Sequence, residues 1–378
     1  MSAHHPITIV GAGLGGLTLA RILHLNGVEA AVYDLDASPT ARSQGGMLDI
    51  HEDTGQVALR AAGLVDEFRA AIHAGGEATR VLDRSATVLV DEGEDGDDRG
   101  RPEVNRRALR DILLASLPDG VIRWGAKVTG VRALSDGRHE VAFADGSTVT
   151  TDLLVGADGA WSKVRALLTD ATPVYSGLSF VEANLDDADV RHPGAAEVVG
   201  SGMLFALGED KGFLGHRDPD GGLHVYCALR TPEGWSADFV DSPEARIALL
   251  DHFEDWDDRL RSLVTDADGT LVARPVHALP VGTRWDRAPG VTLIGDAAHL
   301  MSPFAGEGAN LALFDASELA AALVEHSDDV EKALAAYEES MFPRAARSAQ
   351  ESVEGLDLCF RADAPHGLVA AFQGMGQR

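Results

Sequence analysis

The sequence predicts an α/β fold in which an antiparallel sheet is inserted into a domain of parallel strands, followed by a C-terminal helical segment. Three observations indicate this fold. A βαβ pattern opens the chain, and apolar strands of the buried type recur at residues 152–157 and 291–294. Short alternating runs separated by Gly, Pro and Asp fill most of the region between them. The parallel strands therefore lie on both sides of the insertion.

The βαβ pattern occupies the first 34 residues. Residues 7–10 are a β-branched run suited to a buried strand, residues 17–25 carry apolar side chains at helical spacing, and residues 30–33 resume a strand. Between the first strand and the helix stands Gly11-x-Gly13-x-x-Gly16. In this context the pattern predicts a Rossmann-like dinucleotide-binding turn.

Each position of this turn has a physical role. Gly11 permits the tight turn, Gly13 lets the backbone approach a pyrophosphate, and Gly16 lets the helix pack on the strand. The helix N-terminus offers amide donors and the positive end of its dipole. Asp34 ends the second strand near the separation expected for a ribose hydroxyl contact. The alternative is a glycine-rich turn that binds nothing.

The region from residue 173 to 285 predicts an antiparallel sheet. Its alternating runs are residues 174–184, 202–207, 211–216 and 223–229, with a helix expected near 245–263. The acidic run 91–98 is expected to be a solvated loop. The predicted domains are a discontinuous first domain (residues 1–172 and 286–330), a second domain (173–285) and a C-terminal helical segment (331–378).

The chain is strongly acidic, with 32 Lys and Arg against 60 Asp and Glu and a formal net charge of −28. Such a surface repels phosphate backbones and anionic lipid heads, which disfavours nucleic acid and membrane partners. The two cysteines, Cys227 and Cys359, form no CxxC, so neither a disulfide framework nor a metal site is expected. The low cysteine content favours a cytoplasmic location, and the charged tail helix favours a monomer.

Two further glycine-containing strings follow strands of the buried type. One is Gly-Ala-Asp-Gly at 156–159, and the other is Gly-Asp-Ala-Ala-His at 295–299, which continues as a glycine-rich loop at 303–310. Asp296 could accept a hydrogen bond from the ribityl chain of a flavin. The loop opens a helix, so its amides would stabilise the negative charge that develops at flavin N1/C2=O.

With these three motifs in this order, the chain resembles the class A flavoprotein monooxygenases, the fold family of para-hydroxybenzoate hydroxylase. The resemblance spans nearly the whole chain and implies a GR2-type FAD-binding domain. It also implies that Asp158 helps to bind FAD and the pyridine nucleotide, and that Arg165 supports that turn. Within the family the chain is most similar to the TetX-type tetracycline-inactivating monooxygenases, at residues 45–51, 102–106, 162–165 and 295–308.

Carried over position by position, the similarity implies that Asp49, Arg106 and Asp296 contact FAD. It implies that Arg42 meets the nicotinamide nucleotide, the alternative being a surface salt bridge. The complete set of expected cofactor-binding residues is Gly11, Gly13, Leu14, Gly15, Gly16, Asp34, Arg42, Asp49, Arg106, Asp158, Asp296, Pro303, Gly306, Gly308, Ala309 and Asn310.

On the substrate side, His224 matches a substrate-contacting histidine of the TetX group, although a core or surface histidine is the alternative. Glu182 stands where that group has a glutamine, and Gly202 stands near an arginine position. Losing a guanidinium and gaining a carboxylate should alter recognition of a polar, acidic polyketide. His299 is expected only to pack beneath the loop. The expected substrate-side residues are His224, Glu182, Pro303, Phe304 and Gly306.

The resemblance implies hydroxylation of a polycyclic or aromatic small molecule, a tetracycline-like antibiotic being one example. NADPH or NADH would reduce FAD, O2 would add at flavin C4a, and the distal oxygen of the hydroperoxide would be transferred to the substrate, so no catalytic side chain is expected. One alternative is an FAD-dependent oxidoreductase that transfers hydride without oxygen insertion. The other is a flavin-loaded binding protein without turnover.

Overall fold

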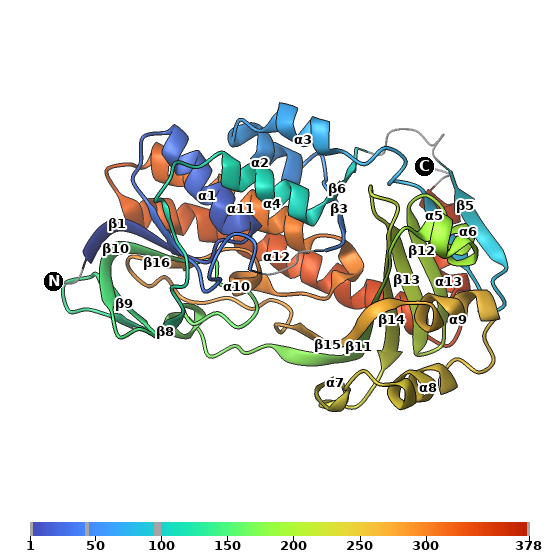
Figure 1. Cartoon of the computed structure of the whole chain (residues 1–378). Helices are drawn as coiled ribbons and strands as arrows, with labels where there is room; N and C mark the ends of the chain where they lie inside the picture. The colour runs from blue at the N-terminus through green and yellow to red at the C-terminus, as the bar shows by residue number, and fades with distance from the viewer. Residues whose placement is uncertain (1–2, 42–44, 94–99, 376–378) are drawn as a thin grey trace.

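The computed structural model describes residues 3–41, 45–93 and 100–375 and contains two large sheets with helices packed around them (Figure 1). The first sheet has the order β7–β2–β1–β10–β9–β8, and β16 also pairs with β10. Its strands are β1 (Ala3–Val10), β2 (Ala31–Tyr33), β7 (Ile122–Arg123), β8 (Val128–Ala133), β9 (His139–Phe143), β10 (Thr148–Gly156) and β16 (Val291–Leu293). The predicted fold class is confirmed.

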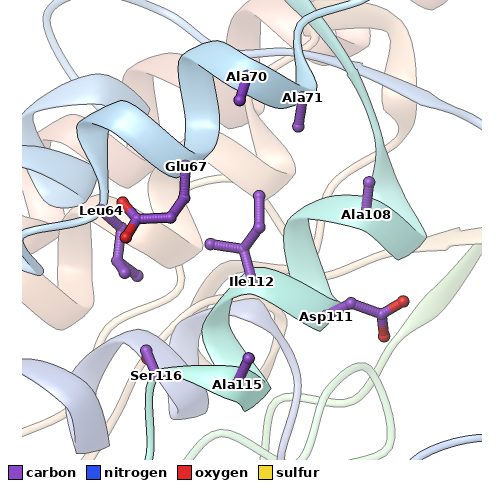
Figure 2. Close-up of a pocket in the computed structure, with 9 residues that line it drawn as sticks. All are labelled: Leu64, Glu67, Ala70, Ala71, Ala108, Asp111, Ile112, Ala115 and Ser116. Atoms are coloured by element: carbon purple, nitrogen blue, oxygen red, sulfur yellow. The ribbon is translucent and has the colours of Figure 1, made fainter.

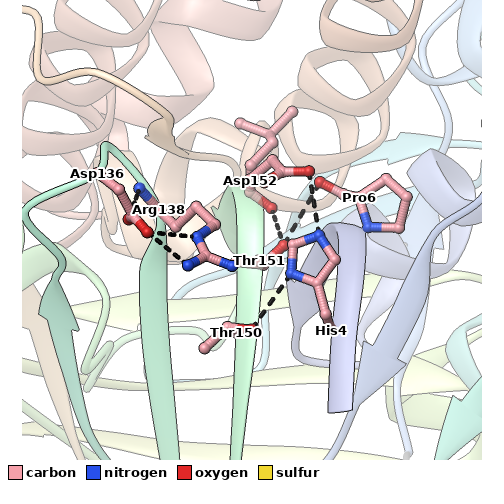
Figure 3. Close-up of polar contacts among 8 residues, drawn as sticks. His4, Pro6, Asp136, Arg138, Thr150, Thr151 and Asp152 are labelled. Carbon is pink, nitrogen blue, oxygen red and sulfur yellow. Dashed lines mark hydrogen bonds and ion pairs between the residues drawn. The ribbon is translucent and has the colours of Figure 1, made fainter. Parts of the chain in front are cut away.

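Strand β10 joins the parallel and antiparallel parts of the first sheet. It is one nine-residue strand that begins before the predicted run 152–157 and ends within it. Its first half pairs with β9 in antiparallel fashion and its second half pairs with β16 in parallel. At the exposed end of the sheet, His4 of β1 contacts the side chains of Thr150 and Asp152, and Arg138 pairs with Asp136 in the turn before β9 (Figure 3).

The second sheet has the order β15–β11–β14–β13–β12–β4–β5. Its strands are β4 (Thr79–Leu82), β5 (Val88–Glu92), β11 (Val174–Leu185), β12 (Met203–Gly208), β13 (Lys211–Arg217), β14 (Leu223–Arg230) and β15 (Asp268–Ala278). Strands β4 and β5 come from the range predicted for the first domain, and β4 pairs in parallel with β12. Asp91 and Glu92, expected in a loop, belong to the edge strand β5. The domain limits stay a prediction.

One face of the second sheet is covered by helices. Alternate side chains such as Val181, Phe213 and Val225 form a core with three helices, α6 (Pro193–Val199), α8 (Pro243–Asp251) and α9 (Asp258–Thr265). The single helix predicted near 245–263 is therefore two helices, each with a capping side chain from Ser242 or Asp257. The opposite face of this sheet, with Leu178 and Leu214, packs against the end of α12 (Val330–Phe360).

The helices of the first domain pack on its sheet around α1 (Leu14–Leu25) and α11 (Gly308–Glu325). Strands β3 (Met47–Asp49) and β6 (Glu103–Asn105) pair with each other in a separate two-stranded sheet. Asn105 then caps α4 (Arg106–Ala115) by accepting from Arg107 N at 3.0 Å. The remaining short elements are α2 (Gly55–Ala61), α3 (Val65–Ala71), η1 (Arg165–Leu167), α5 (Ala188–Arg191), α7 (Trp235–Asp238), α10 (Asp296–His299), η2 (Pro303–Ala305) and α13 (His366–Met375).

Helix α12 (Val330–Phe360) connects the two sheets (Figure 1). Near its start, Leu334 and Tyr337 are buried in the core of the first domain. At its end, Leu356 and Phe360 are buried against the second sheet. The helical tail was predicted, but a helix that packs on both domains was not.

Glu338 of α12 is a buried acceptor for three donors. Its carboxylate accepts from Trp285 Nε1 at 3.0 Å, from Thr292 Oγ1 at 2.8 Å and from the guanidinium of Arg287. Thr292 lies on β16, so this carboxylate fixes α12 to the first sheet. No helix in the described part of the chain is both long enough and apolar enough to span a membrane.

Replacing Glu338 with alanine should therefore destabilise the fold. Glu338→Ala leaves three donors without their acceptor, and we expect the free energy of unfolding to fall by about 3 kcal/mol. The neighbouring Glu339 is exposed, so Glu339→Ala is the matched control and should change stability by less than about 0.5 kcal/mol. Denaturant unfolding measures both, and equal effects would contradict the role given to Glu338.

Candidate functional site

Three turns that are far apart in the sequence meet at one edge of the first sheet. They follow β1, β10 and β16, which are parallel neighbours, so their carboxyl ends lie side by side. Backbone hydrogen bonds extend this alignment into the turns, from Ala157 N to Val10 O at 2.8 Å and from Ile294 N to Gly156 O at 2.9 Å. Carboxyl ends of parallel strands are where open α/β sheets bind ligands.

Glycine is required at two positions of the first turn by the closeness of the backbone. A methyl group on Gly11 would lie 2.2 Å from the carbonyl oxygen of Ala157, and Gly11 has a φ of +109°. A methyl group on Gly16 would lie 2.0 Å from the carbonyl oxygen of Gly11. These two glycines let the first turn, α1 and the second turn pack together.

Gly13 differs from the other glycines of this turn. It is exposed, and a methyl group there would have no heavy atom within 4 Å among the described residues. Gly15 instead faces α11, where a methyl group would lie 2.8 Å from Ala312 O, and the Leu14 side chain is buried in the core. Gly13 therefore leaves its backbone accessible from the solvent side of the turn. Leu14 and Gly15 face the protein interior, so they could contact a ligand only through their backbone.

Asp34 holds the first turn in place. Its buried carboxylate accepts from Ala12 N at 2.6 Å and from Asp36 N at 2.8 Å. An ionised carboxylate has about four acceptor sites, so these bonds leave capacity for a hydroxyl. The ribose contact of Asp34 stays a prediction.

Arg165 ties the second turn to the third. Its guanidinium donates to Ala160 O at 2.9 Å and to Ala297 O at 3.1 Å, and the side chain is buried. Asp158 caps its own turn by accepting from Ser162 Oγ at 2.5 Å and from Lys163 N at 2.6 Å. The supporting position expected for Arg165 is what the structure shows, whereas the Asp158 carboxylate is engaged mainly with protein.

Asp296 and Arg106 present polar groups to this edge. Asp296 is exposed, and neither its carboxylate nor the Arg106 guanidinium has a hydrogen bond to any described residue. Desolvation nevertheless raises the pKa of Asp296, while the charges of His299, Arg106 and Arg165 oppose that rise. With no partner among the described residues, this carboxylate can accept a hydrogen bond from a ligand at this edge.

The N-terminus of α11 lies beside β3. Gly308 begins the helix, and no side chain caps its first amides. The buried side chain of Asn310 donates to the carbonyls of Asp49 at 2.9 Å and Gly306 at 3.1 Å and accepts from His51 N at 2.9 Å. Asn310 thus joins β3 to the loop, and any ligand contact from it would use its backbone.

The carboxylate of Asp49 is paired with a histidine. Asp49 Oδ2 lies 2.8 Å from His51 Nε2, and His51 Nδ1 lies 3.2 Å from Glu307 Oε1. The roles of His51 and Glu307 were not predicted, because nothing in the sequence brings residues 51 and 307 together. Arg42 lies outside the residues that the structure describes.

The two expected substrate-side residues of the second sheet lie on adjacent strands. Glu182 pairs across from Tyr226, and Asn184 pairs across from His224. His224 Nδ1 lies 2.7 Å from Asn184 Oδ1, and burial lowers the pKa of His224. The Glu182 carboxylate accepts from Arg274 Nε at 2.6 Å.

This face of the sheet carries a row of aromatic rings that the sequence did not predict. Tyr226 packs against His224 and Phe180, with ring centroids 4.6 and 5.0 Å apart. Phe304 of η2 continues the row, 6.1 Å from Phe180 and 5.4 Å from Phe360 of α12. Strand alternation places residues 180 and 182 on one face, but only the tertiary packing brings Phe180 to Phe304.

Gly202 and His299 both have structural explanations. A methyl group on Gly202 would lie 2.2 Å from Ala78 O, so no side chain fits where the TetX group has an arginine nearby. His299 Nε2 lies 2.6 Å from the fully buried carboxylate of Asp315, which also accepts from Gly295 N at 2.9 Å and from Arg344 at 3.1 Å. His299 therefore supports the third turn from behind.

The residues at this edge fit FAD. Gly13 and Gly308 both have open space where a Cβ would stand, one for a pyrophosphate and one at an uncapped helix N-terminus. Asp296 and Arg106 offer an acceptor and a cation without partners of their own in the described chain. Pro303 and Ala309 belong to the same loop and helix start, where Ala309 is partly buried against the core.

A separate groove of about 550 Å³ lies between α3 and α4 (Figure 2). It shares no residue with the three turns or the aromatic row. Its lining consists of Leu64, Glu67, Ala70, Ala71, Ala108, Asp111, Ile112, Ala115 and Ser116.

Comparison with known proteins gives a family match along most of the chain. The family model described as FAD binding domain matches residues 4–352. Monooxygenase asqM of Emericella nidulans is 31% identical over 94% of this chain and 95% of its own length. The 3-amino-4-hydroxybenzoate 2-monooxygenase PtnB3 of Streptomyces platensis is 31% identical over 94% of this chain and 88% of its own length.

Solved structures share the fold at lower sequence identity. HpxO of Klebsiella pneumoniae, complexed with FAD and uric acid, superposes with a TM-score of 0.80 at 21% identity, covering 99% of this chain and 93% of that chain. The tetracycline destructase Tet(51) gives 0.71 at 20% identity, covering 99% and 95%. The predicted class of flavoprotein is confirmed, whereas special closeness to the TetX type is not, because 20% identity indicates only the shared fold.

The contrast between Gly16 and Gly13 gives a matched test of the first turn. Gly16→Ala should lower the free energy of unfolding by about 2 kcal/mol, since its methyl group meets the Gly11 carbonyl. Gly13→Ala should leave stability unchanged within about 0.5 kcal/mol but weaken FAD binding by about tenfold, since its methyl group occupies the open side. Denaturant unfolding and flavin titration measure these effects. Wild-type FAD affinity in Gly13→Ala would contradict the assignment.

Proposed function

This chain belongs to the FAD-binding-domain family of flavin-dependent monooxygenases, and on that premise we propose that it hydroxylates a planar aromatic or polycyclic small molecule with NAD(P)H and O2. One observation carries the proposal. The flavin-type edge formed by the three turns is joined, through Phe304, to the aromatic face of the second sheet. A cofactor site and an apolar substrate surface therefore adjoin.

The chemistry that FAD supplies when bound is hydride acceptance from NAD(P)H and transfer of one oxygen atom from O2. The chain contributes binding, orientation and exclusion of water. The first amides of α11 and the positive end of its dipole would stabilise negative charge at the flavin pyrimidine edge. Asp296 and Arg106 would hold the ribityl and phosphate region, and Phe304 with Phe360 would keep water from the reacting atoms.

The substrate face is largely uncharged, which favours a neutral or phenolic aromatic substrate. Burial keeps the pKa of His224 low, so its imidazole is neutral at neutral pH, and burial raises the pKa of Tyr226 to about 12, so its phenol stays protonated. The charge of Glu182 is balanced by Arg274 at 2.6 Å. The rings of Phe180, Tyr226 and Phe304 would stack on the substrate, while His224 and Tyr226 would orient its polar groups.

Two named relatives are consistent with such a substrate. An aminohydroxybenzoate is the substrate in the name of PtnB3, and uric acid is bound in the HpxO structure. Both are small planar molecules. Tetracyclines remain part of the proposal only as members of the wider polycyclic class, because Gly202 has no room for a guanidinium-bearing side chain.

The decisive experiment measures NAD(P)H oxidation and oxygen uptake by the FAD-loaded chain with hydroxybenzoates, aromatic polyketides and tetracyclines. We expect at least one aromatic compound to stimulate both rates and to yield a product heavier by one oxygen atom, labelled when 18O2 is used. The same reactions without O2 are the control. Equal organic product with and without O2 would instead establish hydride transfer and contradict the proposal.

Tyr226 provides a test of the substrate face. Its hydroxyl has no hydrogen bond to any described residue and points toward Gly46, where a methyl group would lie 3.5 Å from it. Tyr226→Phe should raise the KM for the aromatic substrate by about fivefold, the effect of one lost hydrogen bond, with little change in the stability of the fold. Tyr175 is the matched control, because its hydroxyl bonds Thr231 at 2.7 Å. An equal change of KM in Tyr175→Phe would argue against a substrate contact.

A further inference from the structure

His51 lies between two carboxylates from different parts of the fold. Its side chain is 4% exposed, with Nε2 2.8 Å from Asp49 Oδ2 and Nδ1 3.2 Å from Glu307 Oε1. A neutral imidazole has only one N–H and could donate to only one of these acceptors. An imidazolium can donate a hydrogen bond to Asp49 and form an ion pair with Glu307 at the same time, so the geometry itself favours the doubly protonated ring.

The environment of His51 agrees with this protonation state. Burial opposes the charged form, but the hydrogen bonds and charges of Asp49 and Glu307 outweigh it and raise the pKa of His51 to about 9. One Glu307 oxygen, Oε2, is buried without a partner among the described residues. The imidazolium is thus the main counter-charge of two carboxylates that would otherwise face each other.

These contacts join β3 to the loop that would meet the flavin. Glu307 stands between Gly306 and Gly308, directly before α11. The space here is narrow, because a methyl group on Gly306 would lie 3.1 Å from Asp49 Oδ2. Asn310 provides a second, uncharged link between the same two segments.

We propose that His51 is a positioning residue whose imidazolium holds Asp49 and Glu307 together and thereby fixes the loop Pro303–Gly308 for FAD binding. The inference rests on the proposed flavin site and deepens it. Loss of the proton would leave two carboxylates without their counter-charge, and the loop would move away from β3. The described residues contain no group of three or more His, Cys, Asp or Glu side chains arranged to hold a metal ion.

Other titratable and charged groups lie around His51. Glu103 of β6 pairs across from Asp49, and burial, then the charges of Asp49 and Glu77, raises its pKa to about 8. Four charged residues line the same surface groove as His51: Glu52 and Asp53 before α2, Arg60 of α2, and Arg101 before β6. Glu103 and His51 titrate in neighbouring pH ranges, so an experiment must separate the two steps.

The test uses the full chain from which FAD has been removed. The Kd for FAD is measured by quenching of flavin fluorescence at a series of pH values from about pH 6 to about pH 10. In the wild type we expect a Kd that rises as pH passes through about 9. His51→Gln should weaken FAD binding at neutral pH by about tenfold and lose this step, since a charge-assisted bridge is gone. Glu103→Gln should remove only a step near pH 8.

A double variant distinguishes loss of the bridge from general damage. Glu307→Gln removes one carboxylate, so the double variant His51→Gln/Glu307→Gln should recover most of the FAD affinity that His51→Gln loses. Should His51→Gln fail to fold, as judged by its thermal melting, the double variant alone decides, and it must fold and bind FAD. His24, an exposed histidine of α1, is the matched control, and His24→Gln should keep the wild-type pH profile.

Three results would count against the inference. They are wild-type affinity in His51→Gln with its step near pH 9 retained, a double variant that binds no better than the single one, and loss of the step in His24→Gln. Normal FAD uptake by the wild type in these cases would leave the proposed function standing. A wild-type chain that takes up no FAD at any pH would overturn the flavin site and the proposed function together.

Discussion

The site depends on one constraint, the parallel pairing of β10 with β1 on one side and β16 on the other. This pairing brings turns from residues 11, 157 and 295 to a single edge, and the backbone there is so close that glycine is required. Gly11 approaches Ala157, and Gly16 approaches Gly11, each at a distance that excludes a methyl group. The positions of Gly13, Asp158 and Asp296 follow from this arrangement of the three turns.

Charge is distributed unevenly between the surface and the interior of this acidic chain. Its net charge of −28 is a property of the whole sequence, yet several carboxylates near the site are paired with cations. His51 stands between Asp49 and Glu307, Arg274 balances Glu182, and Asp315 is held by His299 and Arg344. Buried carboxylates need such partners because desolvation penalises an isolated charge heavily. The excess of acidic residues therefore affects what the protein surface can bind more than it affects the chemistry of the site.

Local pattern was sufficient to predict most elements and the glycine turns. Three patterns depend only on neighbours in sequence, so the elements they form could be predicted. They are the β-branched run before Gly11, the helical spacing after Gly16 and the alternation at 223–229. The predicted α11 and the helical tail agree with α11 and α12. Strand β15 was missed, since it is a largely exposed edge strand that contains Pro275, and such strands carry a weak signal. Strands β4 and β5 joined the second sheet against expectation, because pairing is decided by long-range contacts.

The sequence by itself determined the fold class, the three motifs and hence the flavoprotein family, because glycine spacing and hydrophobic periodicity are local properties of the chain. Only the tertiary structure decided which residues act together. The bridge from Asp49 through His51 to Glu307 spans more than two thirds of the chain, and the row from His224 to Phe360 joins β14, β11, η2 and α12. Such contacts depend on strand register and on the packing of α12 across both sheets, and neither is encoded by any short stretch of residues.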